Sequence, residues 1–227
     1  MKIYFLSGLG ADETVFYGLQ LPGVERIYLD WMEPLPKESI EQYAGRMAAR
    51  ITEPNPIIIG LSFGGMMAME IAKLIPVQQL ILISSAKTRK ELPPYFAACS
   101  YVPLHKLLPL HTVAYSDTLM GFFFGVRTNT QRAQLKKIIR NTTKGFNQWA
   151  INALVNWKNQ QINAPVFHIH GNADKLLPLS FVKPDIVIEG GNHFMVFQKA
   201  KEISEHIQQV LLSDETERPK VRKSERE

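Results

Sequence analysis

A serine between glycines, at the junction of a predicted strand and a predicted helix, constrains this chain more than any other feature. Residues 60–65 have the sequence Gly-Leu-Ser-Phe-Gly-Gly. The apolar, β-branched residues 56–59 predict a buried strand, and residues 66–75 predict a helix that ends at Pro76. A turn this tight needs small residues two positions before and after the serine, and the helix aims free N–H groups beside the hydroxyl. Ser62 is therefore a candidate nucleophile.

The G-x-S-x-G pattern alone is weak support, because a motif with three fixed positions in five recurs by chance. The alternative is a glycine-rich turn of the kind that any parallel-sheet protein can have between a strand and a helix. The elements and polar turns elsewhere in the chain decide between these two interpretations.

Length and composition limit the class of protein. A chain of 227 residues suits one domain with room for an inserted subdomain, and no apolar run approaches the ~18–20 residues of a membrane helix. We do not expect residues 1–8 to be a signal peptide, because their apolar core is short and leads directly into a glycine loop. The single cysteine, Cys99, excludes an internal disulfide. We predict a soluble, cytoplasmic protein with no membrane span.

Short apolar segments alternate with amphipathic ones along most of the chain. We predict strands at residues 2–6, 26–29, 56–59, 79–84, 164–170 and 185–188, and helices at residues 39–51, 66–75, 130–141, 145–157 and 197–212. Ser39 and Gln42 predict a capping box at the start of the first helix. The alternation predicts an α/β fold with a mostly parallel central sheet and helices on both faces. It breaks over residues 87–160, which contain no convincing strand.

Four glycine-bearing turns follow directly after predicted strands: residues 7–10, 60–65, 170–174 and 190–193. The carboxyl ends of parallel strands lie at one edge of the sheet, so these turns should meet there. A serine hydroxyl needs a base to take its proton, and His193 is the candidate base. Asp174 is the candidate acid that holds the imidazole in the right tautomer. The turn after the fourth strand, residues 84–86, offers no acid in its place.

Two backbone N–H groups are candidates for an oxyanion hole. Phe63 follows the serine and opens the helix, and Leu9 lies in a glycine-flanked loop where the backbone can turn inward. We predict that these N–H groups would hold an oxyanion that develops between them.

With serine, aspartate and histidine in this order, the chain resembles the α/β-hydrolase superfamily, and its small capped esterases and thioesterases in particular. The resemblance covers residues 2–86 and 161–212. It implies a hydrolase core at residues 1–86 and 161–212 and a helical cap at residues 87–160, inserted after the fourth strand. We expect residues 213–227, which are polar and charged, to form a disordered tail.

Two features depart from the family pattern. The first turn has Ser7-Gly8 where the family usually has His-Gly, which removes a ring that often braces the turn. The loop from Asp174 to His193 is also shorter than usual, and residues 176–183 hardly leave room for the helix normally found there.

Aromatic residues predict an apolar acyl pocket beneath the cap. The candidates for substrate contact are Trp31, Phe123 and Trp149, each with ordinary core packing as the alternative.

The basic residues gather in the predicted cap. Residues 87–160 hold eleven Lys and Arg against two acidic residues. Four of them cluster on or near one predicted helix: Lys136, Lys137, Arg140 and Lys144. They form a solvated polar face or contact an anionic part of the substrate, such as a coenzyme A or carrier-protein phosphopantetheine; a membrane or nucleic-acid contact is the third alternative.

The leading hypothesis is a serine hydrolase that cleaves an ester or thioester of a small to medium acyl group through an acyl-enzyme. We expect a small-molecule acyl substrate, no nucleic-acid partner, no cofactor and no metal, since no Cys, His or Asp grouping has metal-ligand spacing. The alternatives are a lyase or acyltransferase on the same scaffold, and a ligand-binding or signalling protein of the same fold with slow or absent turnover.

Overall fold

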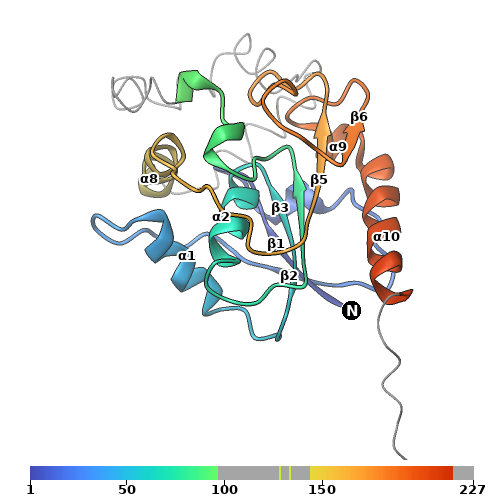
Figure 1. Cartoon of the computed structure of the whole chain (residues 1–227), viewed down its shortest axis with the longest axis horizontal. Helices are drawn as coiled ribbons and strands as arrows, with labels where there is room; N and C mark the ends of the chain where they lie inside the picture. The colour runs from blue at the N-terminus through green and yellow to red at the C-terminus, as the bar shows by residue number, and fades with distance from the viewer. Residues whose placement is uncertain (97–127, 129–132, 134–143, 217–227) are drawn as a thin grey trace, which may run out of the picture.

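A computed structural model describes residues 1–96, 128, 133 and 144–216 of the chain. These residues form a six-stranded, all-parallel sheet with the strand order β2-β1-β3-β4-β5-β6 (Figure 1). The strands are β1 (Lys2–Leu6), β2 (Glu25–Tyr28), β3 (Ile57–Leu61), β4 (Gln79–Ile83), β5 (Val166–Gly171) and β6 (Ile186–Ile188). The predicted fold class is confirmed, and each strand lies within two residues of its predicted bounds.

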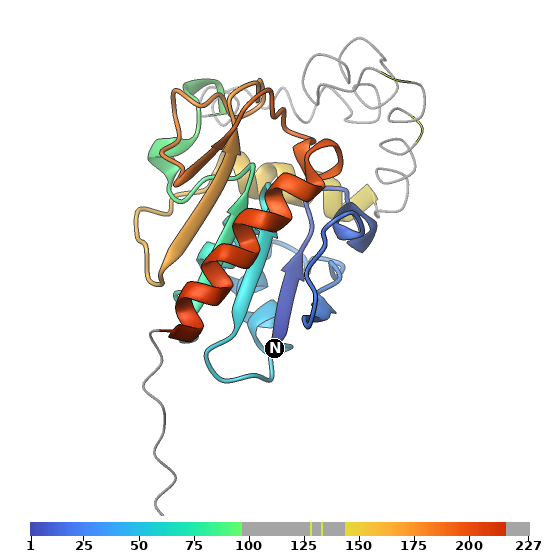
Figure 2. The same cartoon turned by 90° about the vertical axis from the view of Figure 1, so that its right-hand side faces the viewer.

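Helices cover both faces of the sheet, as Figures 1 and 2 show. The first face carries α1, α2 and α8, and α10 crosses the other face. The helices of the described residues are α1 (Ile40–Ala48), α2 (Phe63–Ile71), α8 (Lys144–Val155), α9 (Met195–Gln198) and α10 (Ala200–Thr216), with 3-10 turns η1 (Glu13–Phe16) and η2 (Arg89–Glu91).

The core consists of two apolar layers, one on each side of the sheet. Because successive strand residues point to opposite faces, each central strand supplies both layers. In β4, Leu80 and Leu82 pack with the apolar side chains of α1 and α2, whereas Ile81 and Ile83 pack with those of α10. Side chains buried on both faces explain why the strands are continuous apolar runs in the sequence.

The capping box at the start of α1 is present as predicted. The Ser39 side chain accepts a hydrogen bond from the Gln42 N–H, and the Gln42 side chain accepts one from the Ser39 N–H. The helix is shorter than predicted and ends at Ala48, because the chain there tightens into turns that place Ile51 at the edge of the core.

The end of the chain differs from its prediction in two ways. The predicted helix 197–212 is two helices, because the backbone of Lys199 leaves helical geometry at φ −120° and ψ 23°. The second helix, α10, continues to Thr216, so residues 213–216 are helical and the predicted disordered tail began too early. Residues 217–227 lie outside the described residues.

The helix that follows Ser62 also ends before its predicted limit. α2 stops at Ile71, and residues 72–75 continue in tighter turns before Pro76. Two further elements, η1 and η2, were not predicted, because a single 3-10 turn is too short to show a periodic pattern of apolar residues in the sequence.

The described part of the predicted cap packs directly on the core. In α8, Phe146, Ala150 and Ala153 lie in the same apolar cluster as α1 and α2. After this helix, the buried Trp157 donates from Nε1 to Glu70 Oε1 of α2, at 2.8 Å. The division into core and cap stays a prediction, and the predicted helix 130–141 lies almost wholly outside the described residues.

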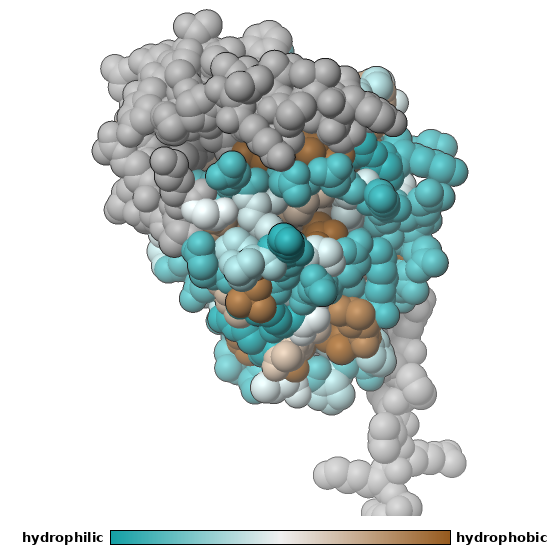
Figure 3. All heavy atoms as spheres, turned by 90° about the vertical axis from the view of Figure 1, so that its left-hand side faces the viewer, coloured by the Kyte–Doolittle hydropathy of each residue, from teal (hydrophilic) through white to brown (hydrophobic). Residues whose placement is uncertain are grey.

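The surface of the described residues is polar on the face that carries α1 and α8. Figure 3 shows that apolar groups on this face are scattered between hydrophilic ones. No helix within residues 1–96 or 144–216 combines the length and the apolar character needed to cross a membrane.

Candidate active site

Ser62 stands in a strained turn between β3 and α2. Its backbone has φ 52° and ψ −118°, a conformation that residues with a side chain rarely adopt. Two hydrogen bonds hold the turn: the Ser62 N–H donates to the Ile83 carbonyl at 2.9 Å, and Ser85 Oγ donates to the Ser62 carbonyl at 2.7 Å. The strain is thus supported by the end of β4, next to it in the sheet.

Glycines flank Ser62 because backbone passes too close for a side chain. A Cβ on Gly60 would lie 2.5 Å from the Gly65 Cα, and a Cβ on Gly64 would collide with the carbonyls of Leu6 and Ser7. The small residues that the motif requires two positions before and after the serine are therefore needed for packing.

The structure brings Ser62, His193 and Asp174 into one chain of hydrogen bonds. Ser62 Oγ lies 2.9 Å from His193 Nε2, and His193 Nδ1 lies 2.7 Å from Asp174 Oδ2. His193 and Asp174 are both buried. The three side chains come from the turns after β3, β5 and β6. These turns lie at the carboxyl edge of the sheet, which is where we predicted that they would meet.

The hydrogen-bond donors around Asp174 determine where the protons lie in the Ser62–His193–Asp174 arrangement. Its Oδ1 accepts the N–H groups of Leu176 and Leu177, at 2.9 and 2.8 Å. Burial acts to raise the pKa of the Asp174 carboxyl, but His193 and the Leu177 N–H outweigh it and hold that pKa below the usual 3.8. An ionised carboxylate only accepts, so His193 carries its proton on Nδ1 and turns the Nε2 lone pair to the Ser62 hydroxyl.

A second histidine touches the same carboxylate. His170 donates from Nε2 to the Leu177 carbonyl at 2.7 Å, and this nitrogen lies 3.5 Å from Asp174 Oδ2. His170 Nδ1 accepts from His168 Nε2 at 3.2 Å. Burial lowers the pKa of both rings, that of His168 to about 2, so both are neutral. Both histidines lie in β5, and the sequence gives no signal for the contact of His170 with Asp174.

The short loop between β5 and β6 forms turns and no helix, as its length predicted. The carbonyls of Pro178 and Leu179 accept the turn-forming N–H groups of Phe181 and Val182. Asp174 itself holds the start of this loop through the Leu176 and Leu177 N–H groups.

The first glycine turn lies against Ser62. A Cβ on Gly8 would meet the Ser62 Cβ at 3.6 Å. Ser7 braces the turn by donating from Oγ to the Ala11 carbonyl at 2.6 Å. Phe63 is the first residue of α2, so its N–H has no acceptor within the helix. The turns of both predicted oxyanion donors, Leu9 and Phe63, thus meet at Ser62.

The candidate substrate residues Trp31 and Trp149 meet over Phe63 in an aromatic cluster with Tyr43 and Phe146. The ring centroid of Phe63 lies 5.5 Å from that of Trp31 and 6.1 Å from that of Trp149. Trp31 also stacks on Phe146 at 5.0 Å. Both tryptophans are half-buried. The apolar cluster around them includes Phe63, the residue that follows Ser62.

Several predicted residues lie outside the described residues. They are Phe123, Lys136, Lys137 and Arg140. Lys144 opens α8, and nothing is described of its side chain. Contacts of the predicted basic cluster with a substrate therefore stay a prediction.

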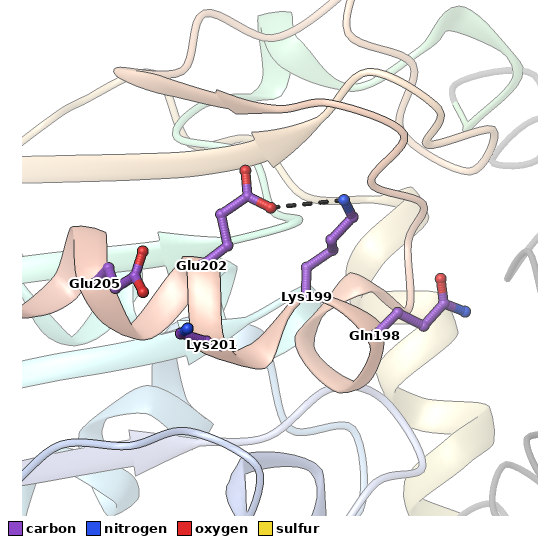
Figure 4. Close-up of a pocket in the computed structure, with 5 residues that line it drawn as sticks. All are labelled: Gln198, Lys199, Lys201, Glu202 and Glu205. Atoms are coloured by element: carbon purple, nitrogen blue, oxygen red, sulfur yellow. Dashed lines mark ion pairs between the residues drawn. The ribbon is translucent and has the colours of Figure 1, made fainter.

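A hollow also lies beside α9 and α10. Its lining residues are Gln198, Lys199, Lys201, Glu202 and Glu205 (Figure 4). The lining includes two lysines and two glutamates, so its formal charges balance, and Lys199 pairs with Glu202 at 3.6 Å. Within the described part of the chain, no group of three or more His, Cys, Asp or Glu residues is placed to hold a metal ion.

Solved structures with this architecture are similar over nearly the whole chain. A lipase-esterase related protein from Clostridium acetobutylicum is 19% identical, with a TM-score of 0.70 over 92% of this chain and 93% of that chain. An enol-lactonase from Burkholderia xenovorans LB400 is 16% identical, with a TM-score of 0.71 over 93% and 91%. A bromoperoxidase from Bacillus anthracis is 17% identical, with a TM-score of 0.68 over 93% and 91%.

Neither a scan against protein-family models nor a search of curated proteins finds a match to this sequence. The structural likeness establishes the fold, because it extends over more than nine-tenths of each of these three chains. The chain has the α/β-hydrolase fold.

Proposed function

We propose that this protein is a serine hydrolase that cleaves an ester or thioester of a small to medium acyl group. The observation that carries the proposal is the bonded chain from Ser62 Oγ through His193 to Asp174, at 2.9 and 2.7 Å. The lipase-esterase related protein and the enol-lactonase of the same fold are consistent with ester chemistry. They leave the substrate open, because one fold hosts many reactions.

In the proposed reaction, Ser62 Oγ attacks the acyl carbonyl carbon as its proton passes to His193 Nε2. Asp174 stabilises the imidazolium that forms and keeps Nδ1 protonated. The carbonyl oxygen becomes an oxyanion between the N–H groups of Leu9 and Phe63. His193 then protonates the leaving alcohol or thiol, and the acyl-enzyme remains.

Water completes the proposed cycle. His193 takes a proton from the water as it attacks the acyl-enzyme, and returns that proton to Ser62 Oγ when the acid leaves. The aromatic cluster of Trp31, Phe63 and Trp149 supports an apolar acyl site, because it adjoins Ser62 through Phe63. The basic residues of the predicted cap are the only support for an anionic, coenzyme A-like portion of the substrate.

The test is hydrolysis of short-chain p-nitrophenyl esters by the wild-type protein and by Ser62→Ala. The alanine variant should fold, since Ser62 is half-buried and loss of its Oγ leaves in place the bonds that its N–H and carbonyl make with the Ile83 carbonyl and Ser85 Oγ. Turnover should fall by about 10⁴ or more. Hydrolysis by the alanine variant at the wild-type rate would refute the proposal.

The two alternative reactions on this scaffold, those of a lyase and of an acyltransferase, differ from hydrolysis in their products. A lyase consumes no water, and an acyltransferase passes the acyl group to an added alcohol, amine or thiol. A panel of acyl esters and thioesters, with and without coenzyme A, therefore distinguishes hydrolysis from both reactions.

A further inference from the structure

We propose that Trp31 is a positioning residue that aims the Leu9 N–H at the oxyanion. The inference rests on the proposed function and concerns a hydrogen bond that the reaction itself does not use. Trp31 Nε1 donates to the Gly8 carbonyl at 3.2 Å, and the Ala11 N–H donates to the same oxygen at 3.1 Å.

The Gly8 carbonyl and the Leu9 N–H belong to one peptide unit. That peptide is trans and planar, so its C=O and its N–H point in opposite directions. Two donors on the Gly8 oxygen therefore fix the direction of the Leu9 N–H on the other side of the plane. A rotation of this peptide would break both bonds at once.

The direction of this peptide matters because the turn lies beside the nucleophile. A Cβ on Gly8 would lie 3.6 Å from the Ser62 Cβ. Leu9 is the next residue in the chain, so the peptide between Gly8 and Leu9 lies beside Ser62. A glycine at position 8 leaves this backbone free to rotate, since no Cβ restricts it. An oxyanion hole works only when its donors are already oriented, so this turn needs an external brace.

Trp31 is well placed to act as that brace. Its indole is fixed by the rings of Phe63, at 5.5 Å, and Phe146, at 5.0 Å. Phe63 supplies the other proposed oxyanion donor, and Phe146 belongs to α8. Trp31 therefore links both donors of the proposed hole to α8, a helix of the predicted cap.

The test is Trp31→Phe, which keeps an aromatic ring and removes the N–H donor. We expect kcat for a p-nitrophenyl ester to fall about tenfold with little change in KM, because Ala11 still holds the Gly8 oxygen. Affinity for a trifluoromethyl ketone, whose adduct with Ser62 carries an oxyanion, should fall by a similar factor. A residue that only packs would not lower this affinity together with kcat.

Trp157→Phe is the matched control. It removes an indole N–H of the same kind, bonded to Glu70 Oε1 at 2.8 Å, from a buried position outside the proposed machinery. This control should lower the melting temperature and leave kcat unchanged. If Trp31→Phe does not fold, β-(3-benzothienyl)alanine at position 31 replaces the N–H with sulfur and keeps the ring shape.

Wild-type kcat and ketone affinity in either folded position-31 variant would overturn the inference. A rise in KM alone would also overturn it, because it would make Trp31 a substrate contact. Failure of the proposed function is distinct, since it would appear as wild-type turnover by Ser62→Ala.

Discussion

Replacing Asp174 with asparagine keeps the size of the side chain but changes which atoms can accept hydrogen bonds. In the protein, Oδ1 accepts the N–H groups of Leu176 and Leu177, and Oδ2 accepts the His193 Nδ1–H at 2.7 Å. The two backbone donors would select the amide oxygen of Asn, because an NH2 group cannot accept from them. The NH2 group would then face His193 Nδ1 and force the imidazole proton onto Nε2.

In that tautomer His193 donates to Ser62 and cannot take its proton. The same replacement in a Ser-His-Asp triad lowers kcat by about 10⁴, which corresponds to about 5 kcal/mol of transition-state stabilisation. We expect a loss of this size for Asp174→Asn with a small change in KM. The reason is that the substitution changes a proton position and leaves the acyl site as it is.

The assay is initial-rate hydrolysis of p-nitrophenyl acetate at neutral pH, with the melting temperature as a measure of folding. Asp185→Asn is the matched control, because the Asp185 carboxylate accepts the His168 N–H at 2.8 Å just before β6, at the opposite edge of the sheet. It should leave kcat within about twofold. A folded Asp174→Asn variant with kcat within tenfold of the wild type would refute the tautomer argument.

Two further predictions concern stability. Gly64→Ala should lower the free energy of unfolding by about 3 kcal/mol or more, because its Cβ would collide with the Leu6 and Ser7 carbonyls. Gly45→Ala in α1 should raise it by about 0.5–1 kcal/mol, since its Cβ would meet only Leu74 Cδ1, at 4.0 Å; equal urea midpoints for the two variants would contradict this. Burial lowers the pKa of His168 from 6.5 to about 2, so its contribution to stability is complete above pH 6.5 and is lost as the pH falls. Between pH 6 and 4 the wild type should lose about 1.4 kcal/mol per pH unit more than His168→Gln, and parallel urea-unfolding curves for the two proteins would exclude it.

Much of the fold is predictable because the strands are buried on both faces. Residues such as 57–59 and 80–83 carry an apolar side chain at every position, and such short runs between turns indicate parallel strands. The meeting of Ser62, Asp174 and His193 then follows from topology, since all three stand in turns after strands. Distances and tautomers required the structure, because they depend on loop backbone that leaves no periodic pattern.

Other features could not be read from the sequence for physical reasons. The bond from Trp31 to Gly8 joins residues 23 positions apart, and no local pattern records it. The helix is interrupted at Lys199, between α9 and α10. Lysine is a good helix former, so the residue type gives no sign of the interruption. Residues 213–216 are polar, and one more helical turn without an apolar position leaves no periodic signal in the sequence.

The central claim is that Ser62 is a nucleophile activated by His193. The most direct measurement is the intact mass of the protein after incubation with a fluorophosphonate, followed by peptide mapping of the adduct. We predict one phosphonyl group on Ser62 of the wild type and none on His193→Ala. An unlabelled wild type, or a label on another serine such as Ser85, would contradict the account.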